Sequence, residues 1–336
     1  MRILGIETSC DDTAAAVVED GTRVLSAERL SSAALQSRFG GVVPEVAARE
    51  HAMTVLPVVE TALEQAGLGL EELDAVAVTQ GPGLLGALLV GVSFAKALGV
   101  ARHLPVIGVH HLEAHLYANA LVDGLYFPAL ALVVSGGHTT LVYWQGHGVL
   151  EVLGETRDDA AGEALDKGAR LLGLGYPGGP LIERLAREAA VPPAVKLPVA
   201  RLEGDSLDFS FSGLKTATEE MVRRGQVDRA SIAWALEDAV VAALARTLDR
   251  AWQRYPTSHV YLAGGVSANR RLAETVQRWA QDHGVIPHIP PPQWCTDNGA
   301  MVAAAGYFRY QRGDQMRLDE GPKTPWPLAT LERSTG

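Results

Sequence analysis

The chain has 336 residues, of which 47% are hydrophobic and 20% are charged, and its formal net charge is −10. This composition is ordinary for a soluble globular protein, and the length suits two domains. Because proteins that bind nucleic acid usually carry a basic excess, binding of this kind would depend on a local patch or on a partner protein.

The N-terminal segment is apolar but meets a carboxylate at Glu7, so we expect a strand there rather than a signal peptide. The two cysteines, Cys10 and Cys295, lie far apart and do not make a disulfide framework, which indicates a reducing cytoplasm. The most apolar long stretch, residues 86–101, is shorter than a membrane span and contains Lys96. We expect this stretch to be a core helix and the protein to have no membrane association.

Two pairs of segments repeat the same pattern in the two halves of the chain. Residues 2–18 and 128–144 each have an apolar strand, a small polar turn and a second apolar strand, which predicts two β-hairpins. Residues 74–99 and 259–282 each have a strand, a glycine-rich turn and a helix, and such a helix start can bind an anion. This duplication predicts two related α/β lobes with a cleft between them.

Residues 154–250 break the duplication, because helical periodicity dominates there, most clearly at 160–172 and 232–252. We expect a helical insert in the second lobe, with a loop-rich stretch at 191–211. The predicted division is a first lobe at 1–125, a second lobe at 126–315 and an extended or loosely ordered tail at 316–336, and a return of the C-terminal helix to the first lobe stays open.

His111 and His115 are four residues apart, so on a helix they share one face and can bind one divalent metal ion. Glu113 points roughly 200° away from His111, which argues against the glutamate role of the zinc-protease motif. At least one further ligand is needed. Asp297 is the best distant candidate. The short polar turn that contains it, residues 295–300, is equally well explained as the N-cap of a following helix, and Cys295 is a competing ligand, especially for zinc.

Three turns are candidates for binding a nucleotide, and each is also consistent with an ordinary turn. Glycines at residues 135–139 and 264–269 let backbone N–H groups approach a phosphate, and Asn269 is available to hydrogen-bond a ligand. The rigid turn at residues 176–180 can also pass close to a ligand. Asp166 can bind ribose hydroxyls, with a solvated acidic helix face as the alternative.

In their order along the chain, these motifs resemble the universal family of tRNA N6-adenosine threonylcarbamoyltransferases, once labelled O-sialoglycoprotein endopeptidases. The resemblance spans essentially the whole chain, and the free-standing length looks like the bacterial type. The matching motifs are residues 5–13, 111–115, 135–139, 158–167, 176–180, 211–216, 263–269 and 296–300.

The resemblance implies the duplicated two-lobe α/β fold of actin, Hsp70 and sugar kinases. It implies transfer of a threonylcarbamoyl group from threonylcarbamoyl-AMP to N6 of adenosine 37, in tRNAs reading codons that begin with A, with release of AMP. It also implies one Fe²⁺ per subunit, or Zn²⁺, bound by His111, His115 and Asp297. The residues implied to hold the adenylate substrate, or ATP or AMP, in the cleft are Val133, Val134, Ser135, Gly136, Gly137, Asp166, Gly179, Glu183 and Asn269.

Four further side chains, Glu7, Asp11, Asp12 and His138, are candidate positioning groups near the reacting centre, and which of them acts as a base stays open. The family implies a paralogous, inactive partner subunit and a small ATPase, from which the acidic chain would borrow part of its tRNA binding. Three alternatives remain: a small-molecule kinase of the same fold, a metalloprotease and a non-catalytic nucleotide-binding scaffold.

Overall fold

The structure is a computed structural model that describes residues 1–189, 195–200, 202 and 204–328. The chain divides into two compact units. Unit 1 comprises Met1–Leu125, Gly146–Leu150 and the described part of Gln293–Gly336, and unit 2 comprises Tyr126–Gln145 and Glu151–Pro292.

Unit 1 is built on a five-stranded sheet in the order β3-β2-β1-β4-β5. The predicted hairpin at residues 2–18 is confirmed, because β1 and β2 pair antiparallel from Arg2 opposite Glu19 to Glu7 opposite Ala14. Strands β4 and β5 continue the sheet parallel to β1. The strands are β1 (Arg2–Glu7), β2 (Asp12–Glu19), β3 (Arg23–Ser31), β4 (Ala75–Gly81) and β5 (Val106–His110).

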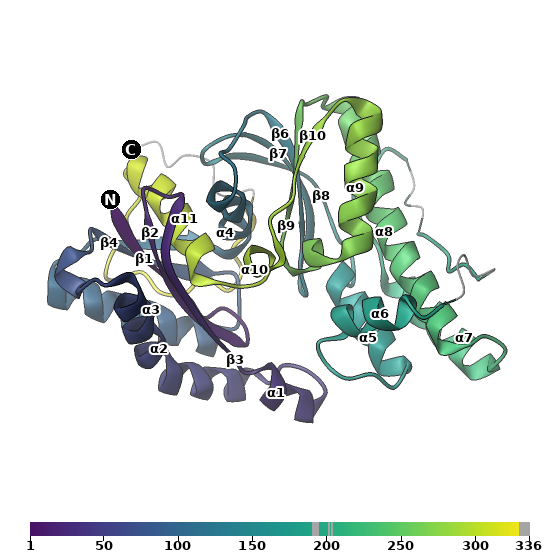
Figure 1. The fold of residues 1–336 in the computed structure, drawn as a ribbon, viewed down its shortest axis with the longest axis horizontal. Coiled ribbons are helices and arrows are strands. Elements are labelled where there is room, and N and C mark those ends of the chain that lie inside the picture. The colour runs from purple at the N-terminus through teal and green to yellow at the C-terminus, as the bar shows by residue number, and fades with distance from the viewer. Residues whose placement is uncertain (190–194, 201, 203, 329–336) are drawn as a thin grey trace. The chain divides into compact units, whose positions relative to one another are not determined.

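Helices cover both faces of this sheet (Figure 1). Helices α2 (Pro44–Ala66) and α3 (Leu85–Arg102) pack on the face that carries Leu4 and Ile6. Helix α11 (Gly299–Gln311) packs on the other face, where Gly5 and Ala77 lie, because successive side chains of a strand point to opposite faces. The shorter helices of unit 1 are α1 (Ala33–Gln36), α4 (His111–Tyr117) and the 3-10 turns η1 (Ser37–Phe39), η2 (Leu70–Glu72) and η3 (Ala118–Leu121), and α10 (Pro292–Cys295) precedes α11.

Small residues let α11 lie directly on the sheet. A Cβ atom added to Gly5 of β1 would lie 2.1 Å from the carbonyl oxygen of Gly299, and one added to Gly306 would lie 2.4 Å from Cβ of Ala77. Larger side chains at these positions would push the helix off the strands, so α11 has one closely defined position on the sheet.

The predicted apolar helix at residues 86–101 is present as α3, and one of its faces lies in the core. Leu88 and Val92 are buried on this face, whereas Leu85 and Leu89 are 60% and 52% exposed. By length and apolar composition, α3 is also the one helix in the described ranges that could cross a membrane. In the structure, 33% of its 18 residues are buried.

Unit 2 is built on a second five-stranded sheet, in the order β10-β9-β6-β7-β8. The predicted hairpin at residues 128–144 is confirmed by the antiparallel pairing of β6 with β7, while β9 runs parallel to β6 and to β10. The strands are β6 (Ala129–Val134), β7 (Thr139–Gly146), β8 (Val149–Glu155), β9 (His259–Ala263) and β10 (Ile286–His288).

The predicted helices of the insert are present. Helix α8 buries Leu236, Val240 and Leu244 along one stripe, against Leu132 and Leu262 of the sheet. In the predicted loop-rich stretch, residues 191–194, 201 and 203 lie outside the described residues. The helices of unit 2 are α5 (Ala161–Leu171), α6 (Gly178–Ala186), α7 (Ser212–Arg224), α8 (Arg229–Arg254), η4 (Gly265–Ala268) and α9 (Arg270–His283).

The segment from Glu320 to Pro327 forms no helix or strand, and residues 329–336 lie outside the described residues. It is nevertheless tied to unit 1 by hydrogen bonds. The backbone N–H of Lys323 donates to the carbonyl of Gln80 at 2.8 Å, and Nε2 of His110 lies 2.7 Å from the carbonyl oxygen of Trp326.

Candidate functional site

Helix α4 begins directly where strand β5 ends, and His110 forms its N-cap. Nδ1 of His110 accepts a hydrogen bond from the backbone N–H of Leu112 at 3.1 Å, which leaves Nε2 to donate to the carbonyl of Trp326. Both ring nitrogens are therefore used in holding the helix start. His110 is a capping residue, although it is adjacent to the histidine pair in sequence.

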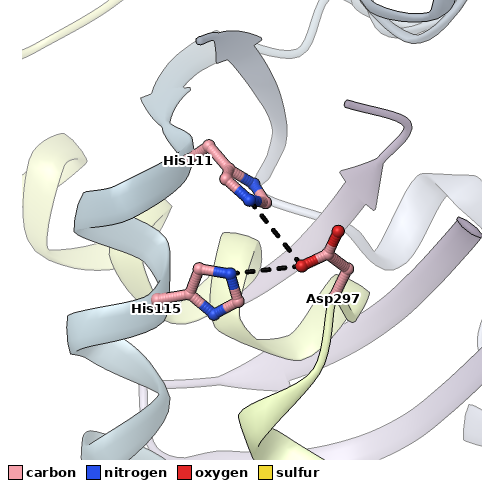
Figure 2. Close-up of side chains that lie close together, drawn as sticks. All are labelled: His111, His115 and Asp297. Carbon is pink, nitrogen blue, oxygen red and sulfur yellow. Dashed lines mark ion pairs between the residues drawn. The ribbon is translucent and has the colours of Figure 1, made fainter. Parts of the chain in front are cut away.

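The two histidines of α4 and Asp297 converge within unit 1, as Figure 2 shows. Nε2 of His115 lies 3.1 Å from Oδ1 of Asp297, and Nε2 of His111 lies 3.7 Å from the same oxygen. One potential ligand atom from each residue lies within 4.8 Å of the others. This cluster can hold a metal ion.

Asp297 is free to face the histidines because its neighbour caps helix α11. Oδ1 of Asn298 accepts a hydrogen bond from the backbone N–H of Met301 at 2.8 Å, so the N-cap is Asn298. The turn does cap the helix, but it does so through Asn298 and not through Asp297. Cys295, the competing ligand, is fully buried, and its thiol is not among the converging atoms.

Glu7 lies behind His111, on the side of the ring away from Asp297. Its Oε2 atom is 3.1 Å from Nδ1 of His111, and the hydroxyl of Ser9 is 3.2 Å from the same nitrogen. Glu7 is itself held by donors from Thr79 Oγ1 at 2.6 Å and from the backbone of Ser9 at 2.5 Å. The fully buried Glu7 thus orients the ring of His111.

The electrostatics of the cluster favour positive charge at its centre. Burial lowers the pKa of His111, but the charges of Asp297 and Glu7 outweigh it and raise that pKa to about 9. Burial raises the pKa of Glu7, yet the charge of His111 and its hydrogen bond leave it below the ordinary value. Asp297 follows the same pattern, because His111 and His115 overcome the effect of burial and depress its pKa.

The donor set fits a divalent transition metal. Both ring nitrogens of His115 are buried; Nδ1 has no partner among the described residues, and Nε2 has only its 3.1 Å contact with Asp297. Buried polar atoms without a partner are rare and call for an explanation such as a ligand. Two imidazoles and one carboxylate suit Fe²⁺ or Zn²⁺ and leave coordination positions for other ligands.

Asp12 stands near this centre with an unusual carboxyl group. Burial, opposed by a hydrogen bond from Ser31, raises its pKa to about 6, and its Oδ1 atom is buried without a hydrogen-bond partner in the described chain. Nη1 of Arg29 lies 3.5 Å from Oδ2 of Asp12 and donates to the hydroxyl of Thr296 at 2.7 Å. Thr296 precedes Asp297 in the chain. Burial also raises the pKa of Asp11. A carboxyl group titrating near neutrality is a candidate proton acceptor.

In unit 2 the turn between β6 and β7 packs against the start of α5. The backbone N–H of Gly162 donates to the carbonyl of Ser135 at 3.2 Å, and a Cβ atom added to Gly162 would lie 2.6 Å from that oxygen. Gly136 and Gly137 at the tip are exposed, and a Cβ atom added to either would meet no described atom within 4 Å. His138 closes the turn, since its carbonyl accepts from Ser135 N at 2.8 Å.

The other predicted ligand residues of unit 2 have structural partners. Asp166 Oδ1 accepts from the backbone N–H of Gly178 at 2.6 Å, next to Gly179, and Glu183 pairs with Arg187. The turn at Gly264 closes on β6, because a Cβ atom there would lie 2.4 Å from the carbonyl oxygen of Val134. Val133 is fully buried in β6.

Asn269 caps helix α9, and its partner Glu237 was missed in the sequence. Oδ1 of Asn269 accepts from Leu272 N at 2.9 Å, and its Nδ2 donates to Glu237 Oε1 at 2.6 Å. Burial raises the pKa of Glu237, which also pairs with Arg271 at 2.9 Å. The available signal was a carboxylate within the apolar stripe of residues 232–252.

Comparison with known proteins decides the family. The model of the family described as TsaD, tRNA N6-adenosine threonylcarbamoyltransferase, matches residues 23–304. The chain belongs to this family. The predicted resemblance is thereby confirmed, and the chain is a threonylcarbamoyltransferase that acts on adenosine N6 in tRNA, not a small-molecule kinase, a protease or a non-catalytic scaffold.

Similar members of the transferase family span nearly the whole chain. The tRNA N6-adenosine threonylcarbamoyltransferase of Symbiobacterium thermophilum is 52% identical over 322 residues, which are 94% of each chain. The enzyme of the same name from Geobacillus thermodenitrificans is 51% identical over 331 residues, which are 96% of each chain. The alignment with both therefore includes most of the segments described above.

Solved structures of more distant proteins show the fold. The HypF protein of T. kodakarensis superposes with a TM-score of 0.63 at 15% identity, covering 93% of this chain and 48% of its own. Component A of the Acidaminococcus fermentans (R)-2-hydroxyglutaryl-CoA dehydratase has a TM-score of 0.55 at 13% identity, covering 93% and 99%. The predicted α/β fold of the actin, Hsp70 and sugar-kinase class is confirmed.

Proposed function

We propose that this transferase moves a threonylcarbamoyl group from threonylcarbamoyl-AMP to N6 of adenosine 37, in tRNAs that read codons beginning with A, and releases AMP. The convergence of His111, His115 and Asp297 in a member of this family is the observation that supports the proposal most directly.

The chemistry requires orientation more than activation. The exocyclic amine of adenine is a poor nucleophile because its lone pair is delocalised into the ring. The carbamoyl carbon is already activated by its bond to the phosphate of AMP. In the transfer the N6–carbon bond forms, the carbon–oxygen bond to AMP breaks and N6 loses one proton. The protein therefore gains most by aligning the two reactants and polarising the carbonyl group.

We assign His111, His115 and Asp297 as the ligands of one Fe²⁺ ion, with Zn²⁺ as the alternative. When bound, the ion supplies Lewis-acid neutralisation of charge on substrate oxygens. Glu7 holds His111 in the tautomer that presents Nε2 toward Asp297. Asp12 is the proposed proton acceptor, since it combines a partly buried carboxyl group with an unpaired buried oxygen. Asp11 and His138 are assigned positioning roles.

The proposed adenylate site lies on unit 2. The exposed backbone of Gly136 and Gly137 can approach a phosphate, and Asp166 is assigned to the ribose. Asn269 is proposed to act chiefly by capping α9, whose N-terminus attracts anions. The full proposed set is Val133, Val134, Ser135, Gly136, Gly137, Asp166, Gly179, Glu183 and Asn269.

We also propose a cytoplasmic assembly with a paralogous inactive subunit and a small ATPase. The net charge of −10 supports a partner that shares the binding of tRNA. Exposed apolar side chains on α2 and α3, among them Met53, Leu56 and Leu89, support a protein contact at this face. Tight, salt-sensitive binding of tRNA by the isolated chain in a filter assay would contradict the sharing of tRNA contacts.

The deciding experiment incubates the chain with tRNA, the partner proteins and threonylcarbamoyl-AMP, followed by mass spectrometry of the nucleosides. The modified nucleoside is expected with the unmutated chain, and a loss of at least about 100-fold in rate with His115→Ala. Glu220→Gln is the control, because it removes one charge from an exposed pair with Arg224 on α7. Absence of the modified nucleoside in the unmutated reaction would overturn the proposal.

A further inference from the structure

We propose that Glu113 is a positioning residue for the metal-binding helix α4, and that it acts through its ion pair with Arg309 of α11. The inference rests on the metal centre proposed above. Glu113 contributes no ligand atom to that centre. Its effect is on the orientation of the helix that carries His111 and His115.

The carboxylate of Glu113 is completely buried between two guanidinium groups. Its Oε2 atom lies 2.7 Å from Nη1 of Arg309, and its Oε1 atom lies 3.6 Å from Nη2 of Arg312. Asp314 balances the second positive charge, at 2.9 Å from Arg312 and 3.5 Å from Arg309. The cluster is therefore electrically neutral overall, with Glu113 as its member from α4.

Helix α4 cannot maintain its own orientation. It has seven residues, about two turns, and helices of this length are unstable without tertiary contacts. Glu113 leaves the helix roughly 200° from His111, so it anchors the side opposite the metal ligands. Because all three side chains belong to one rigid body, a rotation that breaks the pair with Arg309 also turns both imidazoles away from Asp297.

Helix α11 is the rigid partner in this arrangement. Asp297 precedes its first turn, and Arg309 lies in its last turn, about 15 Å along the axis from Gly299. The close packing of Gly5 against Gly299, and of Gly306 against Ala77, gives α11 one position on the sheet. The element that presents the third ligand at one end thus anchors the helix of the first two ligands at the other.

An ion pair suits this role better than an apolar contact. Buried ion pairs often add little stability compared with apolar residues of similar volume, whereas they restrict geometry. The planar guanidinium of Arg309 donates hydrogen bonds to a carboxylate only in certain directions. A leucine at position 113 could fill the space, but it would allow small rotations of α4.

The test measures binding of Co²⁺, by titration of its visible absorption, to the full chain prepared without metal. Glu113→Gln is expected to weaken Co²⁺ binding by roughly 10-fold or more and to change the absorption bands, as removal of groups that orient metal ligands does elsewhere. Arg309→Lys keeps the charge but removes the planar fork, and it is expected to show a smaller loss of the same kind. This second variant decides the matter if Glu113→Gln does not fold.

A matched variant separates positioning from general stability. Val59→Ala removes apolar contacts of α2 in the core of unit 1, far along the chain from α4. It is expected to lower the melting temperature and leave Co²⁺ affinity and absorption unchanged. The double variant Glu113→Gln with Arg309→Gln should lose no more affinity than the worse single variant, since both act through one contact.

Two failures can be told apart. If the unmutated chain binds Co²⁺ and Glu113→Gln binds it equally, with the same absorption, the positioning role is wrong and the metal centre stands. The same conclusion follows if Val59→Ala weakens Co²⁺ binding as much as Glu113→Gln does at equal loss of stability. If the unmutated chain binds no Co²⁺, the metal centre itself is wrong and the inference falls with it.

Discussion

Oε2 of Glu7 lies 3.1 Å from Nδ1 of His111, while Nε2 of the same ring points toward Asp297. A buried carboxylate behind a ligand histidine selects its tautomer and increases its basicity. Glu7 therefore belongs to the support of the metal centre, and its burial keeps it away from solvent.

The first prediction concerns this support. Glu7→Gln is expected to weaken Zn²⁺ binding roughly 10- to 100-fold, because an amide neither carries the charge nor selects one tautomer of His111. Competition with a coloured chelator measures the affinity. Glu220→Gln, on the exposed surface of α7, is expected to bind as the unmutated chain does. Equal affinities for all three proteins would show that Glu7 does not tune the site.

The second prediction distinguishes Asp297 from Cys295 as the third ligand. Asp297→Asn is expected to lose most of the bound metal, since the amide has no charge and its oxygen is a weaker ligand. Cys295→Ser keeps the geometry of the cluster and is expected to retain metal, at some cost in stability because the thiol is fully buried. The metal content of protein purified without oxygen, measured by mass spectrometry, distinguishes the two ligands. If Cys295→Ser lost the metal and Asp297→Asn retained it, Cys295 would be the ligand.

The third prediction follows from the pKa of Asp12, raised from 3.8 to about 6. The native state holds this proton between about pH 4 and pH 6 where the unfolded chain has lost it, so stability falls as the pH rises through this window. Above about pH 6 the ionised carboxylate of Asp12 lowers the free energy of unfolding by about 3 kcal/mol, the equivalent of this change in pKa. Solvent reduces this value little, because the side chain is only 15% exposed. Asp12→Asn should therefore stabilise the fold at pH 7.5, hardly change it at pH 4, and slow the transfer reaction.

Urea unfolding at several pH values tests this expectation. The control is Asp205→Asn, whose side chain is 97% exposed, and its unfolding free energy should change little at either pH. A loss of stability at pH 7.5 on Asp12→Asn would mean that the contact with Arg29 outweighs the effect of burial.

The fourth prediction compares two glycines that are both the second residue of a helix. A Cβ atom at Gly162 of α5 would lie 2.6 Å from the carbonyl oxygen of Ser135 and 2.8 Å from Cα of Gly136, whereas one at Gly213 of α7 would meet no described atom within 4 Å. Gly162→Ala should displace the turn, cost about 1–3 kcal/mol of stability and weaken AMP binding about 10-fold. Gly213→Ala should do neither. Calorimetric titration with AMP measures the affinity of both variants, and thermal unfolding measures their stability. Equal AMP affinities would remove the turn from the proposed site.

Local patterns in the sequence predicted much of this structure. The alternation of apolar residues at 2–18 and 128–144 predicted both hairpins, and the helical periodicity at 232–252 predicted most of α8. These patterns are reliable because they depend on backbone periodicity within one element. The spacing of His111 and His115 belongs to the same class, since two residues four apart on a helix are neighbours whatever surrounds them.

Roles that depend on a particular atom were harder to predict. Asp297 and Asn298 are adjacent, and either residue type caps helices well, so the sequence left the choice of cap open. Only the folded chain shows Asn298 bonded to Met301 while Asp297 faces the histidines. In the same way Asn269, predicted to bind a ligand, uses its side chain on Leu272 and Glu237.

The sequence by itself determined the family, the fold class and the pair of histidines, because those are written in residue order and local spacing. The tertiary structure decided which distant side chains meet that pair. It placed Asp297 in front of the rings, Glu7 behind His111, and Arg309 against Glu113. Such meetings depend on how α4, β1 and α11 pack on one sheet, and packing is a property of contacts between elements that no local pattern contains.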